Sequence, residues 1–270
     1  MTRLTVDHIH GMAEGLKAYD LSLRESTGLN LLAVACRAAD TSPGEAMRRL
    51  AAVTVAVVPV TAGQGVIDGF AESVSSILEH LGAQAFVTVA TDVSGIAQAV
   101  EEGARLLFMA DDHRFVALDL RNGGLVDSTE ATARGFVAAL EAMSGGLEDK
   151  SVLVIGVGRV GEAAVRALLD LGARPRVHDI DVARAMEVAG RHAVPVEEDL
   201  EHALGRHTRV IDASWASGII CSHHVTPEMV LAAPGIPLGV SPEAIPLLGK
   251  RLVHDALEIG VATMLVMSLG

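Results

Sequence analysis

The hydrophobic positions of this chain follow two different rhythms. Residues 5–50 show apolar residues at helical spacing, with breaks at 27–28 and 42–44, which predicts two or three helices. From residue 53, short apolar runs alternate with longer amphipathic segments, a pattern typical of strand–helix–strand units in a parallel sheet. The strands expected in this half cover residues 53–60, 85–90, 105–110 and 115–120, and a long helix is expected at 128–144.

The alternation of strands and helices restarts after Ser144-Gly145-Gly146, which we take as the domain junction. The last segment, residues 257–269, is apolar all round, so this helix is expected to pack back on the domain seam. We predict an α/β protein of two domains: N-terminal helices plus a small parallel sheet in residues 1–147, for the substrate, and a Rossmann-type dinucleotide-binding domain in residues 148–270. The strands expected in the second domain cover residues 152–156, 174–179, 208–214, 236–240 and 251–255.

Composition narrows the range of partners. Half of the residues are hydrophobic but only 3% are aromatic, which suits parallel sheets covered by alanine-rich helices. The 21 Lys and Arg residues against 34 Asp and Glu residues give a net charge of −13. Because there is also no basic cluster, nucleic acids and anionic membranes are disfavoured as partners. We expect a small-molecule ligand, and a homodimer is compatible with the sequence.

The cysteines and the N-terminal segment indicate the compartment. Cys36 and Cys221 lie far apart and neither belongs to a Cys-x-x-Cys pair, so we expect both to be reduced and buried. The N-terminal segment lacks the apolar core of a signal peptide, and no apolar segment reaches about 18 residues. These features predict a cytoplasmic protein.

A glycine loop after the strand at 152–156 has the spacing of a dinucleotide-binding turn. Gly156 permits the tight turn, Gly158 lets the backbone approach a pyrophosphate, and Gly161 allows the following helix to pack closely. The N–H groups at the start of that helix, where Arg159 and Val160 lie, favour an anion. The loop therefore predicts a bound dinucleotide.

Two further positions extend this cofactor site. Asp179 ends the next strand about 20 residues on, where an acid can accept hydrogen bonds from both adenosine ribose hydroxyls and disfavours a 2′-phosphate, which predicts NAD. Asp181 is the rival for this role, but its position is more typical of a helix cap. Ala213 and Ser214, after Asp212, are expected near the nicotinamide half, and the alternative is an ordinary turn of small residues.

A second glycine loop, at residues 61–66, lacks the third glycine of the dinucleotide spacing. It follows a strand whose end is expected to face the domain cleft, and it would offer backbone donors and the Thr61 hydroxyl to a small polar ligand. Asp111 and Asp112 end a neighbouring strand, and an acidic pair in a cleft can hold a substrate ammonium. The alternative is that one carboxylate caps the turn while the other is solvated.

No other catalytic pattern competes in the sequence. The histidines, among them the pair His223 and His224, show no metal-ligand spacing with a nearby carboxylate, so we predict no metal site. The serines lack a nucleophile-elbow context. Hydride transfer needs neither, because the cofactor carries the chemistry while the protein positions the reactants and excludes water.

Six short motifs follow one another along almost the whole chain: VPVT-x-G-x-G at 58–65, DVSG at 92–95, MADD at 109–112, GVGRVG at 156–161, PGIP at 234–237 and GVATML at 260–265. Together these motifs resemble the PylD family, which completes pyrrolysine biosynthesis. The resemblance implies an NAD-dependent dehydrogenase that oxidises the terminal amine of 3-methyl-D-ornithyl-N6-L-lysine. The resulting imine would hydrolyse with release of ammonia, and the semialdehyde would close onto the α-amine as the pyrroline ring of pyrrolysine.

Carried over by position, the resemblance implies a catalytic and substrate-anchoring role for Asp112. The chain departs from the family pattern at Ala62, where a hydroxyl residue is usual, and at His113, where a small amide is usual. Leu4, taken alone, is also compatible with a hydrophobic staple of the first helix. The substrate-binding residues implied in this way are Leu4, Thr61, Ala62, Gly63, Gly65, Val66 and Asp112.

Two other functions remain open. One is a dehydrogenase of the shikimate or methylene-tetrahydrofolate type, although the acid–base lysine of that type has no counterpart in the glycine loops or the MADD strand. The other is a nucleotide-sensing protein without turnover.

Overall fold

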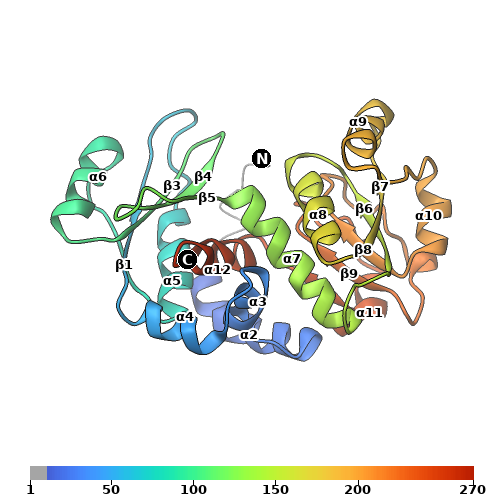
Figure 1. Cartoon of the computed structure of the whole chain (residues 1–270), viewed down its shortest axis with the longest axis horizontal. Coiled ribbons are helices and arrows are strands. Elements are labelled where there is room, and N and C mark those ends of the chain that lie inside the picture. Colours follow the sequence, from blue (N-terminus) through green and yellow to red (C-terminus); the bar gives the residue numbers. More distant parts are fainter. Residues whose placement is uncertain (1–10) are drawn as a thin grey trace. The chain divides into compact units, whose positions relative to one another are not determined.

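The computed structural model describes residues 11–270, and these form two compact units, each with its own five-stranded sheet (Figure 1). Unit 1 contains residues 11–21, Asn30–Gly135 and Ala256–Gly270, and unit 2 contains Ser22–Leu29 and Phe136–Asp255. Both sheets combine with helices around buried apolar residues. The α/β fold class expected from the sequence is therefore confirmed.

The sheet of unit 1 has the strand order β2-β1-β3-β4-β5. Strands β2, β1 and β3 are parallel, as expected, but β4 and β5 are antiparallel to their neighbours. A parallel connection needs about a dozen residues or more, and the loops before β4 and β5 are much shorter. The strands expected as strand–helix–strand units are thus parallel, whereas β4 and β5 add an antiparallel edge, and β5 was not expected. The strands are β1 (Thr54–Val58), β2 (Gln84–Val87), β3 (Leu106–Ala110), β4 (Phe115–Asp119) and β5 (Leu125–Asp127).

The helix α12 (Glu258–Met267) is buried along almost its whole length and packs on α3 and α5 within unit 1 (Figure 1). Its close approach to α7 depends on two glycines. A Cβ at Gly135 would lie 2.4 Å from Ile259 Cγ2, and a Cβ at Gly260 would lie 2.7 Å from Thr132 Oγ1. The other helices that begin in this unit are α2 (Met12–Thr27), α3 (Leu31–Ala38), α4 (Pro43–Leu50), α5 (Phe70–His80), α6 (Asp92–Glu101) and α7 (Ser128–Ser144). None of the helices in residues 11–270 combines the length and apolar character that a membrane span requires.

The sheet of unit 2 is entirely parallel, with the strand order β10-β9-β8-β6-β7. Its strands are β6 (Ser151–Ile155), β7 (Arg174–His178), β8 (Arg209–Asp212), β9 (Val230–Ala233) and β10 (Leu252–His254). The helical segments of this unit are α8 (Arg159–Asp170), α9 (Val182–His192), α10 (Leu200–Arg206), α11 (Ile245–Leu248) and the short 3₁₀ turns η1 (Ser222–His224) and η2 (Gly249–Arg251).

One strand expected in unit 2 was misplaced. The sequence favoured residues 236–240, whereas the strand is β9, and Val240 makes only an isolated bridge with Ile220. Pro234 and Pro237 have no N–H group to donate to a ladder, so they interrupt an otherwise apolar run. The strand therefore ends before the first proline.

Each sheet has a topological switch point beside its first strand. The chain leaves β1 for β2 on one side and later returns to β3 on the other side, and it leaves β6 for β7 and later returns to β8 in the same way. At such a point the loops from the carboxyl ends of the two adjacent strands diverge, and ligands commonly bind there. Both glycine loops, at 61–66 and 156–161, begin at these points.

The contact between α7 and α12 generates a stability prediction. We expect Gly135→Ala to destabilise the protein by about 1 to 3 kcal/mol, because the added methyl overpacks the contact with Ile259. The control is Gly15→Ala in α2, where a Cβ meets nothing within 4 Å in the described part of the chain; it should stabilise by about 0.4 to 1 kcal/mol. Urea unfolding of both variants measures the difference, and equal stabilities would contradict the tight crossing.

Candidate functional site

The glycine loop after β6 has the backbone geometry of a dinucleotide-binding turn. Gly156 has a φ of +77°, and a Cβ there would lie 2.7 Å from the Cα of Ser214. A Cβ at Gly161 would lie 1.9 Å from the carbonyl oxygen of Gly156. A Cβ at Gly158, by contrast, would meet no described atom within 4 Å. Two glycines thus pack the loop against the protein, while Gly158 leaves one face open to a ligand.

The start of α8 is suited to an anion. Gly158 is its N-cap residue and supplies no side-chain cap, so backbone N–H groups of the first turn keep the capacity to bind an external acceptor. Arg159 is exposed and Val160 is half-buried in this turn. The partial positive charge of the helix end adds to the effect of these donors.

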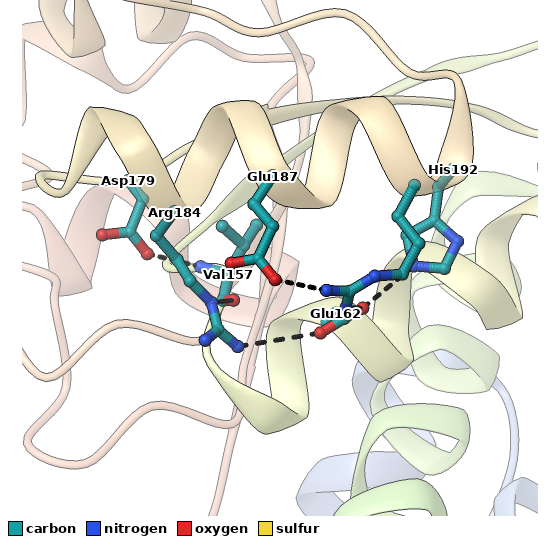
Figure 2. A network of polar contacts seen from close by, with 7 residues as sticks. Val157, Glu162, Asp179, Arg184, Glu187 and His192 are labelled. Carbon is teal, nitrogen blue, oxygen red and sulfur yellow. Dashed lines mark hydrogen bonds and ion pairs between the residues drawn. The ribbon is translucent and has the colours of Figure 1, made fainter.

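Asp179 is held against the glycine loop at the end of β7 (Figure 2). Its Oδ2 accepts a hydrogen bond from the Val157 N–H at 2.7 Å, and its Oδ1 accepts one from the Asp181 N–H at 2.9 Å. Asp181 itself accepts from the N–H groups of Ala183 and Arg184 and so caps α9. Both carboxylates therefore have the places that the sequence suggested, and each oxygen of Asp179 can still accept from a ligand hydroxyl.

A network of charged side chains joins α8 to α9 beside this loop (Figure 2). Arg184 Nε donates to the Val157 carbonyl at 3.1 Å, and Arg184 Nη2 lies 3.7 Å from Glu162 Oε2. Glu162 also accepts from Arg191 and His192. Although burial opposes ionisation, the hydrogen bonds from His192 and Arg191 hold the pKa of Glu162 below its usual value. Through Arg184, the network holds the Val157 carbonyl of the glycine loop.

The end of β8 carries a buried acid that the sequence did not single out. Asp212 is fully buried, and its Oδ1 accepts from the Ser214 hydroxyl at 2.7 Å and from the Ser214 N–H at 3.1 Å. Burial raises the pKa of Asp212. A Cβ at Gly239 would lie 1.9 Å from its Oδ2, so a glycine is required there. The carboxyl holds Ala213 and Ser214 in a tight turn beside Gly156.

In unit 1, the glycine loop after β1 lies against the end of β3. Asp112 Oδ2 accepts a hydrogen bond from the Gln64 N–H at 2.8 Å, and a Cβ at Gly63 would lie 2.1 Å from the same oxygen. Gly63 and Gly65 both have positive φ, at +73° and +82°. Thr61, Ala62 and Val66 are exposed on this loop. The structure thus brings the candidate substrate residues of the described chain together at the switch point.

Asp111 has a different role from its neighbour. Its Oδ1 accepts from the N–H groups of His113 and Arg114, at 2.8 and 2.7 Å, and these bonds hold the pKa of Asp111 below its usual value. Asp111 therefore caps the turn between β3 and β4, while Asp112 reaches the glycine loop.

The donors of Thr61 are already engaged within the protein. Asp92, the first residue of α6, accepts from the Thr61 N–H at 2.8 Å and from the Thr61 hydroxyl at 2.6 Å. The Thr61 N–H and the hydroxyl proton are therefore used within the protein, and a contact of the Thr61 hydroxyl with a ligand stays a prediction. Asp92 carried no signal of its own beyond its place in the DVSG motif, because the contact spans 31 positions in the sequence.

Three further residues were singled out in the sequence: Leu4 and the two cysteines. Leu4 lies outside the described residues, so its substrate contact stays a prediction. Cys36 is buried, as expected, and burial raises the pKa of its thiol to about 11. Cys221, by contrast, is only partly buried, because it lies at the start of η1 rather than in the core.

One group of potential metal ligands lies in unit 2. Ligand atoms of Cys221, His223 and His224 lie within 4.8 Å of one another, and Glu201 lies 2.7 Å from His223 Nε2 and 2.9 Å from His224 Nε2. This carboxylate partner was not evident from the sequence. However, His224 Nδ1 accepts the Cys221 N–H at 2.9 Å, so the proton of a neutral ring lies on Nε2 and faces Glu201. Neither nitrogen of a neutral His224 ring then offers a free lone pair, which favours a hydrogen-bonded cap over a metal centre.

Comparison with known proteins gives consistent matches. A family model described as the N-terminal domain of the pyrrolysine biosynthesis protein PylD matches residues 8–126. Two relatives named pyrrolysine synthase, from Methanosarcina acetivorans and Methanosarcina barkeri, are 30% and 31% identical to this chain. The alignments cover 98% of this chain in both cases, and 98% and 97% of the two relatives. Shikimate dehydrogenase from Aquifex aeolicus has a similar fold, with a TM-score of 0.54 over 77% of this chain and 88% of that one, at 14% identity.

The geometry around Asp179 generates a prediction on cofactor choice. Asp179→Ala should weaken NAD binding by about 1 to 3 kcal/mol, as expected for a lost hydrogen bond to a charged group, and should narrow the preference for NAD over NADP. Asp181→Ala is the matched control, because it removes a nearby carboxylate that caps α9, and it should leave this preference unchanged. Calorimetric titration of both cofactors measures the effect, and wild-type NAD affinity in Asp179→Ala would remove Asp179 from the site.

Proposed function

This chain belongs to the PylD family of pyrrolysine biosynthesis proteins, and from this premise we propose that it is an NAD-dependent dehydrogenase acting on 3-methyl-D-ornithyl-N6-L-lysine. The observation that carries the proposal is the match to pyrrolysine synthases over almost the whole chain. The carbon that bears the terminal amine would lose a hydride to the nicotinamide, and the amine nitrogen would lose a proton to solvent, which gives an imine. Water then converts the imine to a semialdehyde and releases ammonia. The α-amine condenses with that aldehyde, loses water and gives the pyrroline ring.

We assign the cofactor to unit 2. The open face at Gly158 and the start of α8 fit a pyrophosphate, while Asp179 fits the ribose hydroxyls. Arg184, the arginine of this network that contacts the glycine loop, is engaged with the Val157 carbonyl and Glu162, so it is not arranged for a 2′-phosphate and NAD is favoured. When bound, the nicotinamide accepts the hydride. The residues that would hold the cofactor are Gly156, Gly158, Arg159, Val160, Gly161, Asp179, Ala213 and Ser214.

We assign the substrate amine to Asp112 in unit 1. One oxygen of this carboxylate fixes the Gln64 N–H, and the carboxylate has further lone pairs that can accept from an ammonium. Arg114, two residues further along the chain, pairs with Asp127 at 2.9 Å. Asp112 would thus bind and orient the amine beside the exposed loop residues.

A spectrophotometric assay tests the proposed function. The protein is mixed with NAD and the isopeptide, and the absorbance of the reduced cofactor is followed over time. Growth of this absorbance together with formation of pyrrolysine would support the proposal. NAD binding without any turnover would support a sensor instead, and oxidation of shikimate or of methylene-tetrahydrofolate would support the other dehydrogenase type.

The chemistry of the amine generates a pH prediction. An alkyl amine has a pKa near ~10.4, so it arrives protonated at neutral pH, and a carboxylate favours that charged form. A hydride can depart, however, only from a carbon whose attached nitrogen is neutral, because the nitrogen lone pair must form the C=N bond. Turnover should therefore rise from neutral to alkaline pH, which initial rates between about pH 7 and 10 would measure. A flat profile would contradict the amine assignment.

Variants of the neighbouring residues Asp112 and Asp111 distinguish a carboxylate that binds the substrate amine from one that caps a turn. Asp112→Asn should raise the KM for the isopeptide by about tenfold, the size of a lost hydrogen bond to a charge, and NAD affinity should stay within about twofold. Asp111→Asn is the matched control, since Asp111 caps its own turn, and it should change KM much less. An unchanged KM in Asp112→Asn would return Asp112 to a structural role.

A further inference from the structure

The residue Asp92 occupies a constrained place beside the first glycine loop. Its φ is +54°, which is uncommon for a residue other than glycine, although Asp and Asn adopt it more readily than most. Its N–H donates to the Pro59 carbonyl at 3.0 Å, directly after β1. A Cβ at Gly95 would lie 2.5 Å from the Ala90 carbonyl oxygen and 2.7 Å from Val58 Cγ1. The DVSG motif thus allows α6 to start directly against the end of β1.

This placement decides what Thr61 can offer to a ligand. A threonine hydroxyl has one proton, and here that proton is donated to Asp92 Oδ2 over 2.6 Å. The hydrogen bonds from the Thr61 hydroxyl and N–H hold the pKa of Asp92 below its usual value, so the carboxylate stays an acceptor near neutral pH. The exposed Thr61 hydroxyl can therefore only accept a hydrogen bond from a ligand.

The other side of the loop has the same polarity. The Gln64 N–H donates to Asp112, just as the Thr61 N–H donates to Asp92. Two carboxylates, from the start of α6 and the end of β3, thus engage donors of the loop and place negative charge beside it. An ammonium group, which has three donors and no acceptor, is complementary to this arrangement, whereas a carboxylate is repelled.

We propose that Asp92 is a positioning residue for substrate recognition, which makes the Thr61 hydroxyl an acceptor for an ammonium group of the substrate. The inference rests on the proposed function and adds a second amine-recognition element to Asp112. Asp92 acts through Thr61 and does not itself contact the reacting carbon. The substrate half bound here would be the methylornithyl half, which carries two amines.

The test compares Asp92→Asn with Thr61→Val and with the double variant. In Asp92→Asn the amide can donate to the Thr61 hydroxyl, which turns its proton outward, while Asn still tolerates the positive φ. We expect the Kd of the isopeptide for the enzyme–NADH complex, which cannot turn over, to rise by about tenfold in each single variant. Because Asp92 acts through Thr61, the double variant should be no worse than either single variant. Thr61→Ser, which keeps the hydroxyl, should bind like wild type.

Controls separate folding from recognition. Asp40 also has a positive φ, of +50°, but lies between α3 and α4; Asp40→Asn should leave the Kd unchanged. All variants should keep NADH affinity within about twofold, since the cofactor residues belong to unit 2. An unchanged Kd in Asp92→Asn would overturn the proposal. Additive losses in the double variant would do so as well, because Asp92 would then act independently of Thr61.

A simpler probe keeps this inference separate from the proposed function. If the wild-type protein fails to oxidise the isopeptide, the proposed reaction is lost, but the polarity of the loop can still be measured. Saturation-transfer NMR with 1,4-diaminobutane should show binding to the wild-type protein and loss of binding in Asp92→Asn, while succinate should not bind to either. Equal diamine signals in both proteins would reject the role of Asp92.

Discussion

Both candidate sites depend on one constraint of parallel sheets. When the first strand of a sheet lies between two later strands, the connections that follow neighbouring strands run to opposite sides. Beside β1 and β6 the loops from neighbouring strand ends therefore diverge, and no crossover helix covers the gap between them. The residues that follow these strands must turn sharply at an open edge. This requirement explains why a glycine loop follows each of them, with positive φ at Gly63, Gly65 and Gly156.

An open edge leaves backbone N–H groups without a ladder partner, and in this protein carboxylates supply the partner. Asp179 accepts from Val157, Asp112 from Gln64, Asp92 from Thr61 and Asp212 from Ser214. Except for Asp212, which binds within its own turn, each acid comes from a different strand end or helix start than the loop it holds. A hydrogen bond between an ionised acceptor and an N–H is stronger than a neutral one, so these acids help to fix the loops.

The sequence was informative where the signal is local. The spacing of Gly156, Gly158 and Gly161 after a buried strand predicted the turn, because strand, loop and helix start follow one another directly. The alternation of apolar runs likewise predicted most strands, and it failed at 236–240, where prolines interrupt the run. The contact of Asp92 with Thr61 joins positions 31 residues apart, and the contact of Glu201 with His223 joins positions 22 apart. Such pairings depend on strand order, which single-sequence spacing does not contain.

The two glycine loops differ in polarity because their helices begin at different distances from the turn. In unit 2, α8 begins at Arg159, directly after Gly158, so its first N–H groups and its dipole face the open side of the loop. In unit 1, α5 begins only at Phe70, beyond the loop at 61–66, while Asp92 and Asp112 engage loop donors nearer to β1. The same switch-point geometry is therefore suited to an anion in unit 2 and to a cation in unit 1. This difference disfavours a second nucleotide at the first glycine loop.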